Sequence, residues 1–379
     1  MKRHKTNIAW LNLIHAKTRF IASLGGISFA IFLIFMQLGF FGAVGKSATL
    51  IYDNLNFDIL LISRKSLDAS VTQPISISQL YQANGVAGVK SVMPFYIGFK
   101  QWRNVDTKLT RAILIMGFNP KNKAFANDTI YKNISLLKVQ NNLLIDKFSR
   151  PEYGDTYLGM ETELGGRKCK VVGYYKMGTA LRFDGSVIMS DQSFINFFPG
   201  FELDKPSLGL IKINQKANVK LIAQKIRNYL PENIEVLTRN QAEARDRKYW
   251  ITSTSVGYIF GTGAIMGFIV GAVIIYQALY SNVLDYLQEY ATLKAIGYSN
   301  YRLTIIVFNQ ALYLAILAYI ISFILALIIY FITYSTTRLP IFMTIDRAVF
   351  VATSALFMSL FSTVISLRKL FVSNPADLF

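Results

Sequence analysis

The chain has 379 residues, of which 53% are hydrophobic and only 16% are charged, and its 40 Lys and Arg against 22 Asp and Glu give a formal net charge of +18. An average soluble domain carries about 25% charged residues, so this composition argues against an ordinary soluble protein. A basic chain usually suggests nucleic acid as a partner, but that interpretation depends on where the charge lies.

Four long stretches contain no Asp, Glu, Lys or Arg, and they are 26, 36, 35 and 20 residues long. A transmembrane helix needs roughly 20 apolar residues to cross about 30 Å of hydrocarbon, whereas buried helices of soluble proteins keep a polar face. The sequence therefore predicts four spans, near 20–44, 251–278, 303–330 and 348–367. The first is longer than the apolar core of a cleaved signal peptide and no A-x-A site follows it, so we expect it to be retained.

Lys and Arg residues are distributed unevenly around these spans. One side carries nine: Lys2, Arg3, Lys5, Lys17, Arg19, Lys294, Arg302, Arg368 and Lys369. The opposite short loop, 331–347, carries Arg338 and Arg347. Because cytoplasmic loops carry the excess of Lys and Arg, we expect both termini, the 279–302 loop and the 368–379 tail to be cytoplasmic, and the segment 45–250 to be outside.

The segment 45–250 contains 29 Lys and Arg against 18 Asp and Glu, a net charge of +11. Because this charge is predicted to lie outside the cytoplasm, it argues against nucleic acid as a partner. The basic residues that flank the spans suit contact with anionic membrane lipid instead.

The chain begins with a segment, 1–19, whose pattern favours an amphipathic helix at the membrane surface with Trp10 at the interface; a solvated tail is the alternative. The segment 45–250 is long enough for a core of its own, and its pattern predicts a mixed α/β domain. Predicted strands lie near 56–65, 92–102, 110–118, 169–178 and 185–190, and predicted helices near 75–84 and 218–230. The expected fold is an α-helical membrane protein with one span before and three spans after a large extracytoplasmic α/β domain.

The second span carries glycines at four-residue spacing, which are Gly257 and Gly261, and Gly263, Gly267 and Gly271. Small residues at this spacing allow helix backbones to approach closely in lipid. We therefore expect a helix–helix contact, either within the chain or across a dimer.

The sequence contains no recognisable motif for catalysis, metal binding or nucleotide binding. The run GFFGAVGKS (39–47) has Phe40 where a phosphate-binding loop requires glycine. Cys169 is the single cysteine, and the two histidines, His4 and His15, lie in the N-terminal segment. We therefore expect no catalytic residue, metal or cofactor in the chain and no ATP site of its own. Spans free of ionisable side chains also argue against a proton- or ion-coupled transporter.

The loop between the second and third spans is long for a connector, since helix–helix connections usually have about 2–8 residues. Its pattern predicts a short helix that ends near Ile296, with Gly297 as the C-cap residue, and with Asp285 and Glu289 on one side at i, i+4. This loop suits the docking of a cytoplasmic partner.

The stretch EYATLKAIGY (289–298) resembles the E-x-x-x-L-K/R-A-x-G coupling segment of the MacB/FtsX/LolC-type ABC transporter permeases, and NPADL (374–378) resembles their terminal signature, with Asn374 where Asp is usual. The chain is more closely similar to the DevC-type membrane subunit of DevBCA-like exporters. That similarity rests on NIAWLNL (7–13), FMQLGF (35–40), LIDKFSRPEYG (144–154) and GYIFGTG (257–263).

The resemblance implies a dimer of permease subunits in the bacterial inner membrane that binds a separate ABC ATPase, with ATP and magnesium held by that subunit. It further implies a periplasmic adaptor (membrane-fusion) protein, a TolC-type outer-membrane channel and a lipid-like or other hydrophobic substrate. The residues assigned to the ATPase-docking segment are Asp285, Glu289, Tyr290, Lys294, Ala295, Gly297 and Tyr298. The terminal motif comprises Pro375, Ala376, Asp377 and Leu378.

Two other roles within the same family stay open at this point. An FtsX-like protein would regulate a cell-wall hydrolase without export, and a LolC-like protein would release lipoproteins to a carrier. A membrane-bound enzyme would need a catalytic cluster that the sequence does not reveal.

Overall fold

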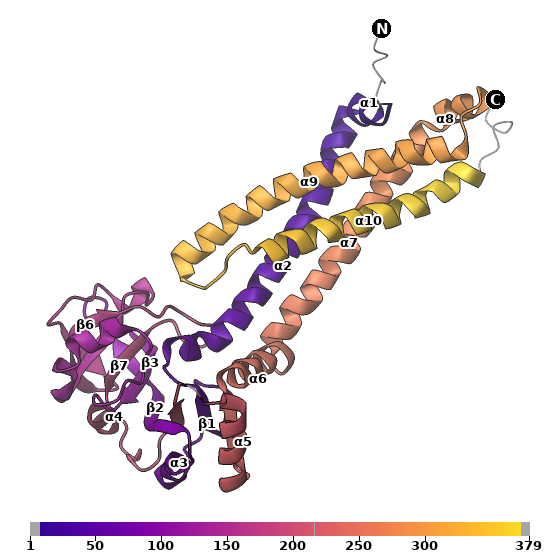
Figure 1. Cartoon of the computed structure of the whole chain (residues 1–379). Coiled ribbons are helices and arrows are strands. Elements are labelled where there is room, and N and C mark those ends of the chain that lie inside the picture. The colour runs from indigo at the N-terminus through magenta and orange to yellow at the C-terminus, as the bar shows by residue number, and fades with distance from the viewer. Residues whose placement is uncertain (1–7, 216, 373–379) are drawn as a thin grey trace. The chain divides into compact units, whose positions relative to one another are not determined.

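The computed structural model describes residues 8–215 and 217–372. The chain forms two compact units. We call the part made of residues 1–41, 258–332 and 341–379 the helical unit, and the part made of 42–257 and 333–340 the α/β unit. Figure 1 labels the elements of both, and the predicted terminal motif 375–378 lies outside the described residues.

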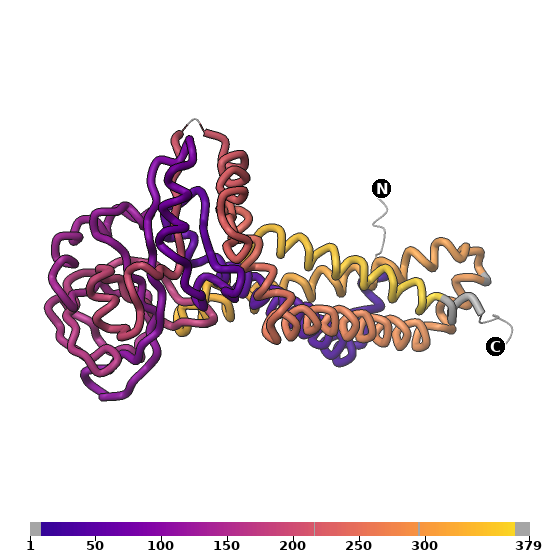
Figure 2. Tube along the Cα trace, turned by 90° about the horizontal axis from the view of Figure 1, so that it is seen from below, coloured from indigo at the N-terminus to yellow at the C-terminus, as the bar shows by residue number. Residues whose placement is uncertain are grey.

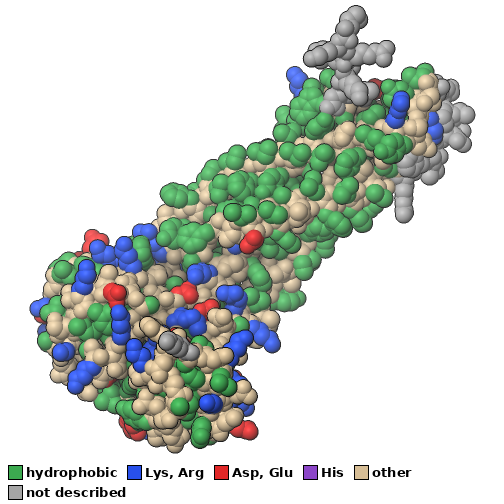
Figure 3. All heavy atoms as spheres, in the orientation of Figure 1, with side chains coloured by type: hydrophobic (Ala, Val, Ile, Leu, Met, Phe, Trp, Pro, Cys, Tyr) green, Lys and Arg blue, Asp and Glu red, His purple; other side chains and the backbone are tan. Residues whose placement is uncertain are grey.

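Four helices are long and apolar enough to cross a membrane: α2 (Lys17–Asn54), α7 (Ser255–Asp285), α9 (Asn300–Thr337) and α10 (Ile345–Val372). The predicted arrangement of one plus three spans is therefore confirmed. In the helical unit the four helices extend in a similar direction (Figure 2), and their outward surface is largely hydrophobic (Figure 3). Four helices of this length and composition, with an apolar surface, indicate a multi-pass membrane protein.

The helices are longer than the predicted spans. α2 continues past residue 44 to Asn54, and its last turns carry Lys46, whose amine lies 2.8 Å from the carboxylate of Asp53. The helix α9 ends at Thr337 and α10 begins at Ile345, so the connection between them is shorter than the predicted 331–347. The predicted start of the second span at 251 is wrong, because helix α6 (Arg239–Thr252) ends there and α7 begins at Ser255.

The N-terminal segment contains the helix α1 (Ile8–His15), within the predicted amphipathic stretch. Its buried residues are Ala9 and Leu13, while Trp10 is partly exposed and its ring meets the rings of Phe20 and Tyr313 edge to face.

Hydrogen bonds between spans add to the apolar packing of the helical unit. Ser322 on α9 donates to the carbonyl of Ser28 on α2 at 2.6 Å, and Ser362 on α10 donates to the carbonyl of Ala272 on α7 at 2.8 Å. Tyr330 on α9 donates to the carbonyl of Phe35 on α2. Hydroxyls that bond across helices in this way satisfy groups that lipid cannot.

The α/β unit is built on a nine-stranded mixed sheet in the order β3-β7-β4-β6-β5-β2-β8-β1-β9. The strands are β1 (Ile59–Ser63), β2 (Val89–Arg103), β3 (Thr110–Phe118), β4 (Asn142–Asp146), β5 (Glu161–Leu164), β6 (Arg167–Tyr175), β7 (Ser186–Ser190), β8 (Leu208–Ile213) and β9 (Ile234–Thr238). The long strand β2 also pairs with β3, so six strands close into a ring.

Helices cover both parts of this sheet. α3 (Ile77–Asn84) and α5 (Val219–Tyr229) bury their apolar faces with β1, β8 and β9, around Leu80, Ile222 and Ile226. The short α4 (Asp191–Phe197) packs Phe194 against the ring, where Gly98 and Gly117 leave room for aromatic side chains. The seven elements predicted for this domain each correspond to an observed element, but β4, β5, β8, β9, α4 and α6 were not predicted.

Candidate functional site

The predicted coupling loop forms a short helix, α8 (Leu287–Ala295), between α7 and α9. Tyr286, with φ −98° and ψ 16°, separates α8 from the end of α7 at Asp285. Asp285 and Glu289 therefore lie on different helices, and the predicted i, i+4 pairing is wrong. Asp285 instead forms an ion pair with Arg19 at the start of α2.

The end of α8 is fixed by a glycine cap. Gly297 has φ +98°, its N–H donates to the carbonyl of Lys294 at 3.1 Å, and the N–H of Tyr298 donates to the carbonyl of Leu293 at 3.0 Å. These two bonds form a Schellman motif, which uses glycine because side chains disfavour positive φ. The predicted C-cap role of Gly297 is confirmed, and α9 begins three residues later at Asn300.

One side of α8 is anchored in the core of the helical unit. Tyr290 is 1% exposed, and its hydroxyl accepts a hydrogen bond from the side chain of Gln310 on α9 at 3.3 Å. Burial raises the pKa of Tyr290 to about 12, so the hydroxyl stays neutral. The hydroxyl of Tyr286 donates to the carbonyl of Asn12 on α1 at 3.0 Å. Tyr290 therefore supports α8 from inside the helical unit, and its part in docking an ATPase stays a prediction.

The other side of α8 is open. Glu289 is exposed, and it has no ion-pair partner among the side chains that the structure describes, which exclude those of Arg368 and Lys369. Ile296 is 69% exposed and Tyr301, in the first turn of α9, is 74% exposed. We call Glu289, Ile296, Gly297 and Tyr301 the exposed face of the coupling loop. It combines one carboxylate with two large apolar side chains, a composition that suits a protein interface.

Two of the other predicted docking residues are neither fully buried nor fully exposed. Lys294 is half-buried, and Tyr298 is half-buried beneath the guanidinium of Arg302, which lies 5.6 Å from its ring centre. The side chain of Ala295 lies outside what the structure describes. Ile296, directly before Gly297, and Tyr301, in the first turn of α9, were not among the predicted docking residues, and their apolar side chains in a polar loop were a usable signal.

The glycines of α7 divide into two groups. A Cβ on Gly263 would lie 2.5 Å from Gln37 and one on Gly267 2.9 Å from Ile34, both on α2. A Cβ on Gly271 would lie 2.9 Å from Met358 on α10 and 3.3 Å from Ala30 on α2. These three glycines therefore form a close contact between α7 and α2, within the chain. Gly261 meets only Phe41, at 3.8 Å.

Gly257 serves a different purpose from the predicted helix packing. A Cβ there would lie 2.2 Å from the carbonyl oxygen of Ile251, in the break between α6 and α7. This glycine lets the chain turn tightly from α6 into the first span of the C-terminal part.

The connection after α9 is bound to the α/β unit, to which residues 333–340 belong. The carbonyl of Thr337 accepts hydrogen bonds from Arg150 at 3.2 Å and from the Thr179 hydroxyl at 3.3 Å. Arg338, with φ +57°, places its guanidinium 6.0 Å from the ring centre of Phe148. Arg150 is itself held by Asp184 at 3.0 Å.

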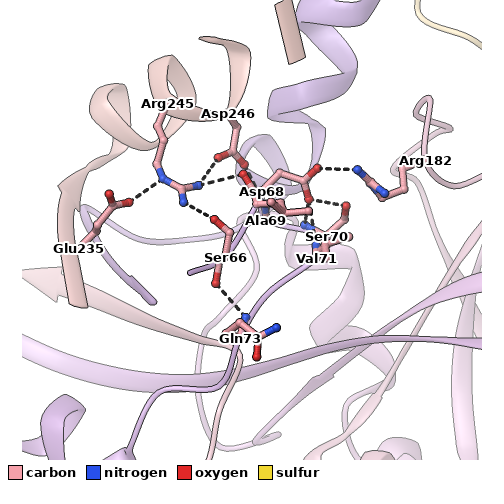
Figure 4. Close-up of polar contacts among 11 residues, drawn as sticks. Ser66, Asp68, Ala69, Ser70, Val71, Gln73, Arg182, Glu235, Arg245 and Asp246 are labelled. Atoms are coloured by element: carbon pink, nitrogen blue, oxygen red, sulfur yellow. Dashed lines mark hydrogen bonds and ion pairs between the residues drawn. The ribbon is translucent and has the colours of Figure 1, made fainter. Parts of the chain in front are cut away.

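A buried polar cluster joins α6 to the loop after β1 (Figure 4). Asp246 on α6 is fully buried, and it accepts hydrogen bonds from the N–H of Ala69 at 2.8 Å and from Arg245 at 2.9 Å. Asp68 accepts from the N–H of Ser70 at 2.8 Å and lies 3.4 Å from Arg182. Burial raises the pKa of Asp246 to about 6 despite these donors. Because α6 leads into α7, the cluster fixes the segment that enters the membrane.

No group of three His, Cys, Asp or Glu side chains able to hold a metal occurs in the described part of the chain. Residues 253–375 match the family described as FtsX-like permease C-terminal. The match includes α7, α8, α9 and α10, and therefore the whole coupling loop.

Two solved structures are similar to the α/β part. One is the periplasmic region of MacB from Actinobacillus actinomycetemcomitans, with a TM-score of 0.37 and 10% identity over 51% of this chain and 94% of that one. The other is the extracellular domain of the noncanonic ABC-type transporter YknZ from Gram-positive bacteria, with a TM-score of 0.34 and 16% identity over 48% of this chain and 100% of that one. Scores this low support no inference about function. No curated protein matches the sequence.

Proposed function

We propose that this protein is the permease subunit of a MacB-type tripartite ABC exporter and that the exposed face of the coupling loop binds the ATPase. The observation that carries the proposal is this face, which lies inside the segment that matches the FtsX-like permease family. The subunit itself hydrolyses no ATP in this proposal. The ABC ATPase subunit supplies hydrolysis, and ATP and magnesium are held there.

The anchoring of α8 supports a role in transmitting motion. Tyr290 on α8 bonds to Gln310 on α9; Tyr286, which precedes α8, bonds to α1; and Asp285, the last residue of α7, pairs with Arg19 on α2. A partner that moves α8 therefore acts on α9 directly, and on α1 and α2 through the two residues that precede α8. A loosely tethered loop would absorb the same displacement.

In this proposal, two sets of hydrogen bonds pass that motion to the α/β unit. The buried cluster around Asp246 holds α6, which continues into α7, and Arg150 and Thr179 hold the end of α9 at Thr337. Displacements of α7 and α9 along their axes would thus reach the α/β unit through hydrogen-bonded joints. In the proposed exporter this unit lies in the periplasm and works with an adaptor and a TolC-type channel to expel a hydrophobic substrate.

The proposal includes two copies of the chain in the inner membrane, with both termini and α8 in the cytoplasm. The positive charge that flanks α8, from Lys294 and Arg302, supports this orientation. The FtsX-like and LolC-like roles use the same helices, so partners distinguish them. Export requires an adaptor and an outer-membrane channel to co-purify with the complex; recovery of a cell-wall hydrolase or a lipoprotein carrier in their place would reassign the function.

The experiment that tests the docking step is purification of the tagged full-length protein from its native membranes, with identification of any ABC ATPase that co-purifies. Glu289→Lys combined with Ile296→Asp should abolish recovery of the ATPase while the protein still inserts into the membrane. The matched control is Glu232→Lys, which makes the same charge change at an exposed position of the α/β unit and should leave recovery unchanged. Undiminished recovery with the double variant would refute the docking site.

A further inference from the structure

The α/β unit contains a cavity of about 570 Å³ that the proposed ATPase coupling does not use. Its wall is formed by the entry into β1, the first half of β2, the end of β8, the loop 121–123 and the chain that leads into α5. A volume of this size falls within the range of roughly 300–1,000 Å³ typical of small-molecule sites.

The charge of the wall is strongly one-sided. Four lysines line the cavity, Lys90, Lys121, Lys123 and Lys212, against one carboxylate, Asp58. They come from three separate parts of the fold, which are β2, the loop after β3, and β8. A concave wall with one sign of charge concentrates counter-ions, since the field is focused by its low-dielectric sides.

The carboxylate and two of the lysines are already engaged. Asp58 accepts from the amine of Lys212 at 2.7 Å and from the N–H of Ile213 at 3.0 Å. Lys123 pairs with Asp128 at 2.8 Å. Lys90 and Lys121 have no ion-pair partner in the described ranges 8–215 and 217–372, so two ammonium groups are available to a ligand.

The remaining wall indicates what else the ligand carries. Amide side chains of Asn122, Asn214 and Gln215 offer both donors and acceptors, which suit hydroxyl groups. The described lining contains no aromatic side chain, so there is no surface on which a nucleobase would stack. Two lysine amines suit a negatively charged phosphate group, which lysine binds as a point charge.

From this lining we propose that the cavity is a binding site for a phosphorylated polyol, either a soluble compound or the headgroup of an anionic phospholipid. Asp58 organises the site by holding Lys212 and the end of β8, while Lys90 and Lys121 contact the phosphate. The proposal concerns the α/β unit alone and does not depend on the coupling of the protein to an ATPase.

The test is isothermal titration of sn-glycerol 3-phosphate into the full-length protein in nanodiscs of phosphatidylcholine. We expect saturable binding that weakens with salt, and no binding of glycerol. The double variant Lys90→Gln, Lys121→Gln should weaken binding at least tenfold. The matched control is Lys168→Gln, Lys170→Gln, which removes the same charge from exposed positions of β6 and should bind as the unaltered protein does.

A second set of nanodiscs, made with phosphatidylglycerol, distinguishes a soluble ligand from a lipid headgroup. Weaker apparent binding of sn-glycerol 3-phosphate there identifies the lipid headgroup as a competing ligand, and unchanged binding identifies a soluble one; both agree with the site. Absence of saturable binding, or equal weakening by the two lysine pairs, would overturn the proposal. Equal thermal unfolding of both double variants shows that neither result comes from misfolding.

Discussion

The hydrogen bond between Tyr290 and Gln310 gives the sharpest prediction about how the coupling loop is held. Tyr290→Phe removes the hydroxyl and keeps the ring, so the amide nitrogen of the fully buried Gln310 loses its partner. The amide oxygen of Gln310 already lacks a hydrogen-bond partner in the described part of the chain. A buried neutral group left unpaired costs about 1–3 kcal/mol.

The length of the hydrogen bond between Tyr290 and Gln310 narrows the expected cost of removing it. The bond is 3.3 Å long, which is longer than the usual N–H···O distance of about 2.9–3.0 Å. We therefore expect the free energy of unfolding to fall by about 1 kcal/mol, at the lower end of this range. For a chain of 379 residues, whose unfolding entropy is about 2.1 cal/mol/K per residue, that loss corresponds to a decrease of about 1 °C in melting temperature. Gln310→Leu combined with Tyr290→Phe removes both partners and should recover most of the loss, because replacing both ends by apolar groups is nearly neutral.

The assay is thermal unfolding of the four proteins of this cycle in one detergent, with Tyr301→Phe as the control at an exposed tyrosine. The reasoning would be refuted if the melting temperature of the double variant fell by the sum of the decreases seen in the two single variants. In that case the hydrogen bond contributes nothing beyond the packing of each side chain.

The other predictions concern the helix contact, the buried carboxylate and the cysteine. Gly267→Leu places a side chain against Ile34 and should destabilise the α2–α7 contact by about 1–3 kcal/mol, while Ile269→Leu, on the exposed side of α7, should leave the melting temperature unchanged. Because the pKa of Asp246 is raised from its ordinary 3.8 to about 6, its protonated form is favoured by folding, so its stabilising contribution is complete below pH 3.8 and is lost as the pH rises through about 6. A melting-temperature profile from pH 4 to 7 should therefore decline less steeply in Asp246→Asn; an identical slope would contradict the assignment. Burial raises the pKa of the Cys169 thiol to about 12, so the folded protein should resist maleimide at pH 7 and react only after denaturation.

The spans and the cap of α8 could be predicted because their signals are local. Long stretches without charge determine a membrane helix, and Gly297 after a helical pattern determines a cap through its positive φ. The strand β8 was missed because LGLIKI is a short apolar run without clear alternation, and such runs do not distinguish strand from helix. Its place beside β1 and β2 depends on pairings made far along the chain.

The candidate site could be predicted only in outline for the same reason. The motif 289–298 gave the position of the coupling loop, but not which of its residues face outward. Tyr290 is buried because Gln310, twenty residues further on, returns beside it in α9. The separation of Asp285 from Glu289 follows from the break at Tyr286, where no proline or glycine marks the sequence. The lysine cavity and the Asp68–Asp246 cluster each join segments far apart in sequence, so no local pattern could indicate them.

The most direct test of the account is a cross-link from the exposed face of the coupling loop to the ATPase. Ile296→Cys, labelled with benzophenone maleimide while Cys169 stays buried, should cross-link to the ATPase subunit in the assembled complex. Tyr229→Cys, at an equally exposed position of the α/β unit, should give no such product. A cross-link to the ATPase from residue 229 and none from residue 296 would contradict both the docking site and the orientation in the membrane.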